Sequence, residues 1–322
     1  EVMDGRVKTL HPRIHMALLA RESHESDLQI LRKEGLEPFD LVVVNLYPFE
    51  EQLQLGKSED ELYEDIDIGG PSLLRAASKN FSRITVVCDP KDYPQVQEQG
   101  FGDLSWRKYL ASKVFSHVSN YDGMIAQELG AQPGGFYWGA PGKLHLTLRY
   151  GENPHQQAFW YERRGADHGI HQAQILQGKE LSYNNLLDLE AAFSLVNQFS
   201  EPCAVAVKHN NPCGVAVGKS SFETLTRALQ ADPVSVFGGI VATNFPIDRN
   251  EAQELSKIFL ECVIAPDYDN EALKILAGKK NLRVLSWSQM LEAHSEWRWR
   301  SVTGGVLVQE ADKVTSLPSK WT

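Results

Sequence analysis

A short, wholly apolar run in the middle of the chain constrains its fold most strongly. Residues 203–207 read Cys-Ala-Val-Ala-Val, without one polar side chain. A continuous apolar run of this length is typical of a strand that is buried on both faces. Such strands are found in α/β proteins, where helices cover both faces of a sheet. The sequence therefore predicts an α/β fold.

A polar cluster follows this strand at once. Residues 208–211 read Lys-His-Asn-Asn, and Pro212 and Gly214 are predicted to turn the chain after them. In α/β folds, ligands bind at the carboxyl ends of strands. An ammonium, an imidazole and two amides at such a place suit proton transfer and the hydrogen bonding of a polar substrate. The alternative is a loop whose His and Asn side chains bond their own backbone.

Further apolar runs and periodic segments extend the α/β pattern along the chain. A buried strand is predicted at 39–45, with Asn45 and Tyr47 at its carboxyl end; the commoner interpretation of Tyr47 is a tyrosine at the core edge. Other strands are predicted at 83–88, 144–150, 236–242, 262–266, 282–285 and 305–308. Helices are predicted at 27–33, 73–80, 106–129, after Asn184 and Asn185 to about 199, and at 249–260, with a capping box at 58–61. The 106–129 helix carries an apolar stripe of Tyr109, Leu110, Val114, Val118, Tyr121 and Ile125.

Two polar segments in the first half suit an anion. The stretch 4–12 carries Arg6, Lys8 and Thr9, and its alternative interpretation is a solvated basic loop. Gly69 and Gly70 precede a helix, and backbone N–H groups at a helix start bind anions. That second signal is weak alone, since Gly-Gly before a helix is common. Asp67 before the turn and Lys79 near the helix end add charge to the region.

Composition bounds the class of protein. The chain has 322 residues, enough for two domains, and a formal net charge of −10. That charge argues against a general nucleic-acid binder. Four cysteines stand apart without a CxxC pair, which favours a reducing cytoplasmic setting over a zinc ribbon or disulfide scaffold. No apolar run approaches the length of about 20 residues that a membrane span needs. The Pro- and Gly-rich stretch 131–143 predicts a linker between domains.

Eight motifs in one order resemble the bifunctional purine biosynthesis family that joins IMP cyclohydrolase to AICAR formyltransferase. They read Gly-Arg-Val-Lys-Thr-Leu-His-Pro at 5–12, Asn-Leu-Tyr-Pro-Phe at 45–49, Asp-Ile-Asp-Ile-Gly-Gly at 65–70, Leu-Arg-Ala-Ala-Ser-Lys-Asn at 74–80, Leu-Arg-Tyr-Gly-Glu-Asn-Pro-His at 148–155, Leu-Ser-Tyr-Asn-Asn at 181–185, Lys-His-Asn-Asn-Pro-Cys-Gly at 208–214 and Val-Ile-Ala-Pro-Asp-Tyr at 263–268. The resemblance implies a methylglyoxal-synthase-like domain at 1–135 and a cytidine-deaminase-like formyltransferase domain at 144–322, each incomplete.

The resemblance also implies two successive reactions. A formyl group passes from 10-formyltetrahydrofolate to the amine of AICAR, and the product FAICAR then closes to IMP with loss of water. Lys208 and His209 match the transformylase centre: the imidazole takes a proton from a poorly nucleophilic amine, and the ammonium favours the neutral imidazole and steadies an oxyanion. The positions that match its substrate contacts are Arg149, Tyr150, Asn184, Phe237, Gly238 and Glu261.

For the ring closure, the resemblance implies catalytic roles for Lys8, Tyr47, Asp67 and Lys79, with Lys79 as the proton carrier. The matching nucleotide contacts are Arg6, Val7, Thr9, Val44, Asn45 and Ile68. No metal is expected, because the zinc signature of the deaminases is absent: Cys213 has no second cysteine at the required spacing. A homodimer in the cytoplasm with small-molecule substrates is expected, without nucleic acid or membrane partners.

The family pattern extends beyond this chain at both ends. A phosphate loop of the Ser-Thr-Gly-Gly type is expected before Glu1, and the rest of the folate pocket is expected after Thr322, so impaired activity is predicted for the segment. Two rivals remain. A nucleotide-binding effector module would not need Lys208 and His209, and a zinc deaminase would need metal ligands that the sequence lacks.

Overall fold

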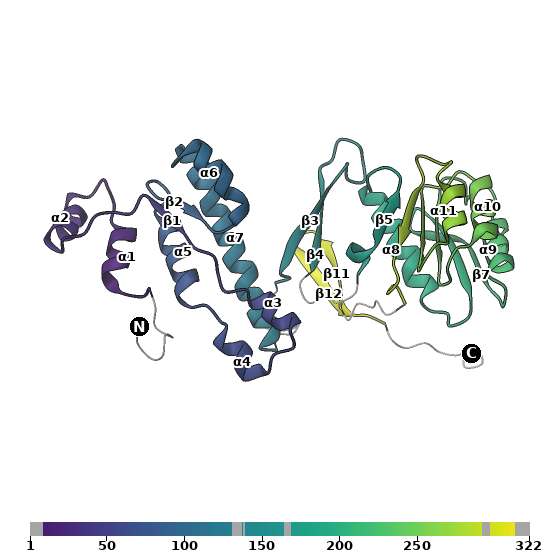
Figure 1. The fold of residues 1–322 in the computed structure, drawn as a ribbon, viewed down its shortest axis with the longest axis horizontal. Coiled ribbons are helices and arrows are strands. Elements are labelled where there is room, and N and C mark those ends of the chain that lie inside the picture. The colour runs from purple at the N-terminus through teal and green to yellow at the C-terminus, as the bar shows by residue number, and fades with distance from the viewer. Residues whose placement is uncertain (1–8, 131–136, 138, 164–168, 292–296, 313–322) are drawn as a thin grey trace. The chain divides into compact units, whose positions relative to one another are not determined.

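The computed structural model describes residues 9–130, 137, 139–163, 169–291 and 297–312. The chain forms two compact units, Glu1–Pro141 and Gly142–Thr322, called here the N-terminal and the C-terminal unit. Figure 1 shows their elements, which mix helices and strands in both. The α/β class predicted from the sequence is therefore confirmed. Within the described ranges, no helix combines the length and the apolarity of a membrane-spanning segment.

The N-terminal unit packs helices around two short parallel strands. The strands are β1 (Leu41–Val43) and β2 (Thr85–Val87). The helices are α1 (Pro12–Leu19), α2 (Glu25–Lys33), α3 (Phe49–Gln54), α4 (Glu59–Glu64), α5 (Gly69–Lys79), the 3₁₀ turn η1 (Pro90–Asp92), α6 (Tyr93–Gln99) and α7 (Leu104–Glu128). Its larger apolar cluster joins α1, α5, β2 and α7 through Leu18, Leu74, Val86, Val114 and Val118.

Several predictions for the N-terminal unit hold, and two are wrong. The capping box at Ser58 opens α4, and α7 covers the predicted long helix. The strand at 39–45 was expected to be buried, but Leu41 and Val43 are exposed, because β1 pairs only with β2 within the described residues. Tyr109 was expected on the packing face of α7, but it is exposed and stacks on Trp106, with ring centroids 5.4 Å apart.

The C-terminal unit is built on a six-stranded mixed sheet in the order β5-β10-β9-β8-β6-β7. Its strands are β5 (Gln174–Gln177), β6 (Cys203–Lys208), β7 (Asn211–Val217), β8 (Ile240–Thr243), β9 (Cys262–Ala265) and β10 (Arg283–Ser286). Its helices are the 3₁₀ turn η2 (Ile170–Gln172), α8 (Tyr183–Val196), α9 (Ser221–Gln230), α10 (Arg249–Lys257) and α11 (Asn270–Leu276). Two separate hairpins, β3 (Gly142–Leu148) with β4 (Ala158–Arg163) and β11 (Trp297–Val302) with β12 (Gly305–Glu310), complete the unit.

Strand β6 is buried on both faces, as its sequence predicts. Ala204 and Ala206 point into the cluster formed with α9, α10 and α11, whereas Val205 and Val207 point into the cluster formed with α8. Alternate residues of a strand face opposite sides, so an all-apolar run serves two cores at once. Figure 1 shows α8 on one side of the sheet and α9, α10 and α11 on the other. The unit therefore has three layers, helix–sheet–helix.

Three local predictions in the C-terminal unit need correction. Pro212 and Gly214 do not turn the chain, because they lie within β7; the turn is formed by His209 and Asn210. The strand predicted at 236–242 begins only at Ile240. The strand predicted from 144 begins at Gly142, inside the predicted linker, and most of that linker lies outside the described residues.

Candidate functional site

The predicted Lys208–His209 centre lies at the carboxyl end of β6, on the side of the six-stranded sheet where its strand ends meet the loops. β6 runs antiparallel to β8, with Val207 opposite Ile240, and β8 runs parallel to β9, with Ile240 opposite Cys262. The carboxyl end of β6 therefore meets the amino ends of β8 and β9. At this end of the sheet, β6 alone among these three strands presents a carboxyl end, the place where ligands bind in α/β folds. The segments that enter β8 and β9 lie at the same end of the sheet as Lys208.

The ammonium of Lys208 is fixed by the segment that enters β8. Its Nζ donates a hydrogen bond to the backbone oxygen of Phe237 at 2.8 Å, and the residue is half-buried. An ammonium has three N–H donors, so two remain available to a ligand. The next residue, Gly238, has φ +75°, and its N–H donates to Phe259 O at 2.7 Å. This sharp bend keeps the exposed Phe237 beside Lys208.

His209 and Asn210 form the tip of the β6–β7 hairpin. Both have left-handed backbone conformations, with φ +54° and +63°, and both are exposed. Positive φ at both central residues matches the right-handed twist of a two-residue hairpin. The Asn211 side chain donates to His209 O at 2.8 Å, and the Asn210 N–H donates to Asp188 Oδ1 at 2.6 Å. The imidazole thus stands on a tightly held turn and faces solvent.

Glu261 enters β9 and is held by a buried cation. Arg283 Nη1 donates to Glu261 Oε2 at 2.7 Å, and Arg283 Nε donates to Glu180 O at 3.0 Å. Arg283 is 2% exposed, whereas the side chain of Glu261 is 40% exposed. One carboxylate oxygen is therefore tied to the protein, and the partly exposed side chain leaves acceptor capacity for a ligand.

The remaining predicted contacts gather at the start of α8. Arg149 Nη2 donates to Tyr150 Oη at 2.7 Å, and the Tyr183 N–H donates to Tyr150 O at 3.4 Å. The side chain of Asn184 donates to Glu152 O at 3.1 Å. Asn184 was expected just before the helix, but it lies within the first turn of α8. Asp188, one turn further along α8, bonds the turn that carries His209. Helix α8 therefore connects the Arg149–Tyr150 segment to the hairpin.

The predicted residues of the N-terminal unit lie at the two ends of α5. Asp67 precedes the helix, and Lys79 is its exposed last residue. Eleven residues at about 1.5 Å per residue separate these ends by roughly 16 Å. Asp67 and Lys79 of one chain therefore cannot bond the same atom, although they can contact two ends of an elongated ligand.

The helix start at Asp67 is already occupied. Gly69 and Gly70 were expected to form a turn before the helix, but they lie in its first turn. The Gly70 N–H donates to Asp67 Oδ1 at 2.7 Å, and the Asp67 N–H donates to Tyr121 Oη at 2.8 Å. A carboxylate thus takes the place that the sequence suggested for an external anion.

Of the other residues predicted for this unit, Val44, Asn45 and Tyr47 follow β1. Asn45 exchanges hydrogen bonds with Tyr93 Oη at 3.1 and 3.2 Å, and the Val44 N–H donates to Val87 O at 3.0 Å. Tyr47 and Ile68 are exposed, by 46% and 57%. Thr9 has φ +54° and is exposed. Arg6, Val7 and Lys8 lie outside the described residues.

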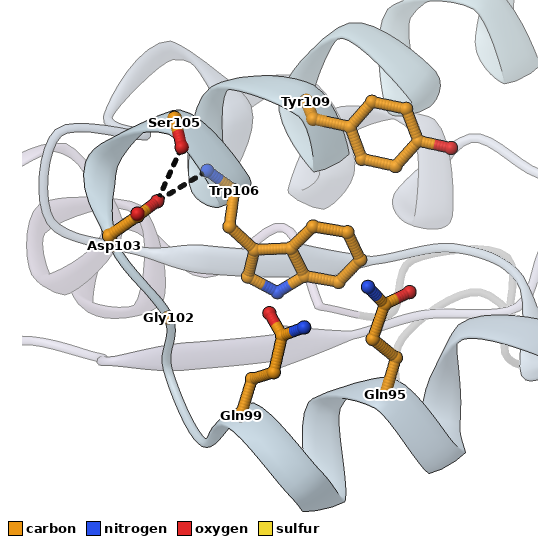
Figure 2. Close-up of a pocket in the computed structure, with 7 residues that line it drawn as sticks. All are labelled: Gln95, Gln99, Gly102, Asp103, Ser105, Trp106 and Tyr109. Carbon is orange, nitrogen blue, oxygen red and sulfur yellow. Dashed lines mark hydrogen bonds between the residues drawn. The ribbon is translucent and has the colours of Figure 1, made fainter.

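Two surface recesses lie apart from both predicted centres. One has a volume of about 680 Å³ and is lined by Gln95, Gln99, Gly102, Asp103, Ser105, Trp106 and Tyr109. Figure 2 shows its Trp106 ring between Tyr109 and the two glutamine side chains. The other, of about 480 Å³, includes Asn197, Asn244 and Leu291. Among the described residues, no three His, Cys, Asp or Glu side chains gather as metal ligands would.

Two residues that the sequence reasoning missed organise the site. Asp188 bonds the hairpin turn, and its signal was a carboxylate four residues after Asn184 on the same helix face. Arg283 holds Glu261, and its only signal was one charge at the start of an apolar run, Arg-Val-Leu. Both contacts join segments that are 22 residues apart, so local pattern does not reveal them.

The fold and site define a two-unit α/β protein with a cation–imidazole pair at a sheet edge, and comparison with known proteins identifies its family. A family model described as AICARFT/IMPCHase bienzyme matches residues 77–322. The chain belongs to this family.

Close relatives span nearly the whole chain. A bifunctional purine biosynthesis protein PurH of Aquifex aeolicus is 50% identical in an alignment 323 residues long, which covers 98% of this chain and 63% of the relative. The PurH of a Thermoanaerobacter species is 47% identical over 98% of this chain and 63% of its own length. The chain thus spans slightly less than two thirds of these relatives. A crystal structure of ForH aligns with 40% of this chain and 69% of its own, at 36% identity and a TM-score of 0.34.

Proposed function

We propose that this chain carries the catalytic groups of the last two steps of de novo purine biosynthesis. In the first step, the amine of AICAR attacks the formyl carbon of a folate-type donor, 10-formyltetrahydrofolate; the bond from that carbon to the folate nitrogen breaks, the nitrogen takes a proton, and FAICAR and tetrahydrofolate result. In the second, the carboxamide nitrogen of FAICAR attacks the new formyl carbon, and loss of water gives IMP. The observation that carries the proposal is the Lys208–His209 pair beside Phe237 in a chain of this family.

For formyl transfer, His209 is the general base and Lys208 the electrostatic partner. The exposed imidazole takes the proton that the amine loses as it forms the C–N bond. Phe237 O takes one N–H donor of Lys208, and the other two are proposed to stabilise the oxyanion that develops on the formyl group. Glu261 and the Arg149–Tyr150 segment are the proposed contacts to the nucleotide, together with Phe237, Gly238 and Asn184.

For ring closure, the N-terminal unit mainly orients one molecule and moves protons. Asp67 and Lys79 are proposed to contact opposite parts of FAICAR, since α5 separates them. Tyr47 and Lys8 complete the catalytic set, with Lys79 as the proton carrier. The proposed nucleotide contacts are Arg6, Val7, Thr9, Val44, Asn45 and Ile68.

The finer architecture belongs to the same proposal. We assign 1–135 to a methylglyoxal-synthase-like cyclohydrolase domain and 144–322 to a cytidine-deaminase-like formyltransferase domain. The three-layer sheet of the C-terminal unit supports the second assignment. A cytoplasmic homodimer that needs no metal completes the proposal; sedimentation of the purified chain as a monomer alone would oppose the dimer.

The test measures the two reactions separately in the purified chain and in the same sequence extended to the length of its relatives. His209→Ala should lower formyl transfer by at least about 100-fold, the smaller end of general-base contributions, and leave FAICAR cyclisation unchanged. Lys79→Ala should do the reverse. His24→Ala, outside both predicted sites, is the matched control. Formyl transfer that survives His209→Ala would refute the assignment.

Two further measurements separate the rivals. IMP binding without turnover in the extended protein would favour a nucleotide-binding module. Stoichiometric zinc in the purified protein would favour a deaminase, although the described residues offer no cluster of metal ligands.

A further inference from the structure

The turn that carries His209 adopts a backbone conformation that its residues disfavour. His209 and Asn210 both have positive φ, and neither is glycine. Asn enters this region more readily than most residues and His is also enriched there, yet both still do so at a cost. Two such residues in succession persist only where surrounding contacts hold them, and they gather at functional sites.

Asp188 of α8 makes the contact that holds this turn. Its Oδ1 accepts the Asn210 N–H at 2.6 Å. With its amide turned so that the nitrogen faces the helix, the Asn210 side chain also donates to Asp188 Oδ1 at 3.1 Å and to Leu187 O at 3.3 Å. The turn is thus bonded through both its backbone and its side chain to one short segment of α8.

Helix α8 is a rigid support for that carboxylate. Its start is fixed by a reciprocal capping box, in which Ser182 accepts from the Asn185 N–H and Asn185 accepts from the Ser182 N–H. Leu189, next to Asp188, is fully buried in the core against β6 and β8. A side chain on a packed helix places its oxygen more accurately than one on a loop.

We propose that Asp188 is a positioning residue for formyl transfer, which sets the place of the His209 imidazole through the hairpin turn. The inference rests on the proposed role of His209. Asp188 acts as a hydrogen-bond acceptor, not through its charge and not on the substrate. Without the acceptor, the tip of the turn is no longer bonded to α8, and the imidazole moves off the path of the amine proton.

Three variants in the full-length sequence separate this role from others. Asp188→Ala removes the acceptor and should lower kcat for formyl transfer about 10- to 100-fold with little change in KM for AICAR, because misplacement by about 1 Å can cost 100-fold. Asp188→Asn keeps an acceptor oxygen and should stay within about three-fold of the parent. Asp188→Ala with Asn210→Gly should recover most of the loss, because glycine adopts positive φ without strain.

The controls lie in the same chain. Glu190→Ala removes a carboxylate of α8 that accepts from Ser194 and should leave formyl transfer unchanged. FAICAR cyclisation should be unchanged in every variant, which shows that the N-terminal unit is folded, and an unchanged urea midpoint of the C-terminal unit shows the same for the unit that carries the substitutions. The pH profile of kcat should keep its shape in Asp188→Asn if the carboxylate does not set the protonation of His209.

Several outcomes would overturn the proposal. They are an unchanged kcat in Asp188→Ala, a loss in Asp188→Asn as large as in Asp188→Ala, or no recovery in the glycine double variant. His209→Ala in the same series distinguishes failure of the proposed function: if it leaves formyl transfer intact, the reaction does not use this imidazole. Hydrogen exchange of the Asn210 amide, slower in the parent than in Asp188→Ala, tests the contact itself in either case.

Discussion

Replacing Arg283 with methionine tests whether a buried cation holds the site edge together. The guanidinium is 2% exposed and joins β10 to Glu261 at 2.7 Å and to Glu180 O at 3.0 Å. Methionine keeps much of the apolar contact of the side chain but donates no hydrogen bond. Glu261 and the Glu180 carbonyl then lose their partner, so the C-terminal unit should lose stability and Glu261 should lose its fixed position.

The magnitude follows from the exposure of the two acceptors. A hydrogen bond to a charged group contributes about 1.5–3 kcal/mol. The Glu261 side chain is 40% exposed and can return to water, so its ion pair with Arg283 contributes near the lower limit. We therefore expect Arg283→Met to lower the free energy of unfolding by about 2–3 kcal/mol. At about 2–4 °C per kcal/mol for a unit of this size, Tm should fall by roughly 5–10 °C.

The assay is urea denaturation, with hydrogen exchange of separate peptides to assign the transition to each unit. Arg298→Met, on the exposed strand β11 of the same unit, is the matched control and should change stability by less than about 0.5 kcal/mol. Glu261→Gln keeps an acceptor and should cost less than half as much as Arg283→Met. A loss below about 1 kcal/mol in Arg283→Met, or one equal to that of Arg298→Met, would refute the reasoning.

Three further predictions concern the same unit. Burial raises the pKa of Glu251 to about 7 from its ordinary 4.5, so protonation of Glu251 stabilises the folded state; this contribution is full below pH 4.5 and is lost as pH rises through 7. Urea midpoints measured between pH 5 and 7.5 should therefore fall with pH in the parent, and Glu251→Gln should remove this fall. Gly214→Ala places a Cβ against the backbone oxygen of Ala228, and the clash between β7 and α9 should lower the free energy of unfolding by at least about 2 kcal/mol. Equal stability of the variant in thermal unfolding would contradict the packing. Burial raises the pKa of the Cys262 thiol to about 12, so iodoacetamide at pH 8 should react first with the half-buried Cys213 of the native protein, as measured by mass spectrometry of its peptides. Equally early labelling of the buried thiols would contradict the structure; these are Cys88, Cys203 and Cys262.

Much of the site could be predicted because it depends on short stretches of sequence. The residues 208 and 209 follow an apolar run that had to be a strand, so their place at its end was predictable. The hairpin turn was predicted three to four residues too late, because Pro212 and Gly214 are stronger turn formers than His and Asn. A contact from Asp188 outweighs that local preference, and no local pattern shows it.

Burial and strand direction were harder to predict than the elements themselves. The sequence around β1 is as apolar as a core strand, yet burial depends on what packs against it, and among the described residues only β2 pairs with it. Likewise, α5 was predicted with Asp67 and Lys79 near its two ends, but their separation of roughly 16 Å follows from the length of the intact helix.

The sequence by itself determined many of the strands and helices, and that Lys208 and His209 lie at the end of a doubly buried strand. Continuous apolar runs and the alternation of apolar with polar residues involve only a few neighbouring residues, so they can be recognised in the sequence without the tertiary structure. Only the tertiary structure decided that β6 runs antiparallel to β8, which brings Phe237 to Lys208 and Glu261 to the same end of the sheet, and that Asp188 and Arg283 fix the turn and the carboxylate. The order and direction of strands in a sheet depend on packing between distant segments, and local preferences do not encode that packing.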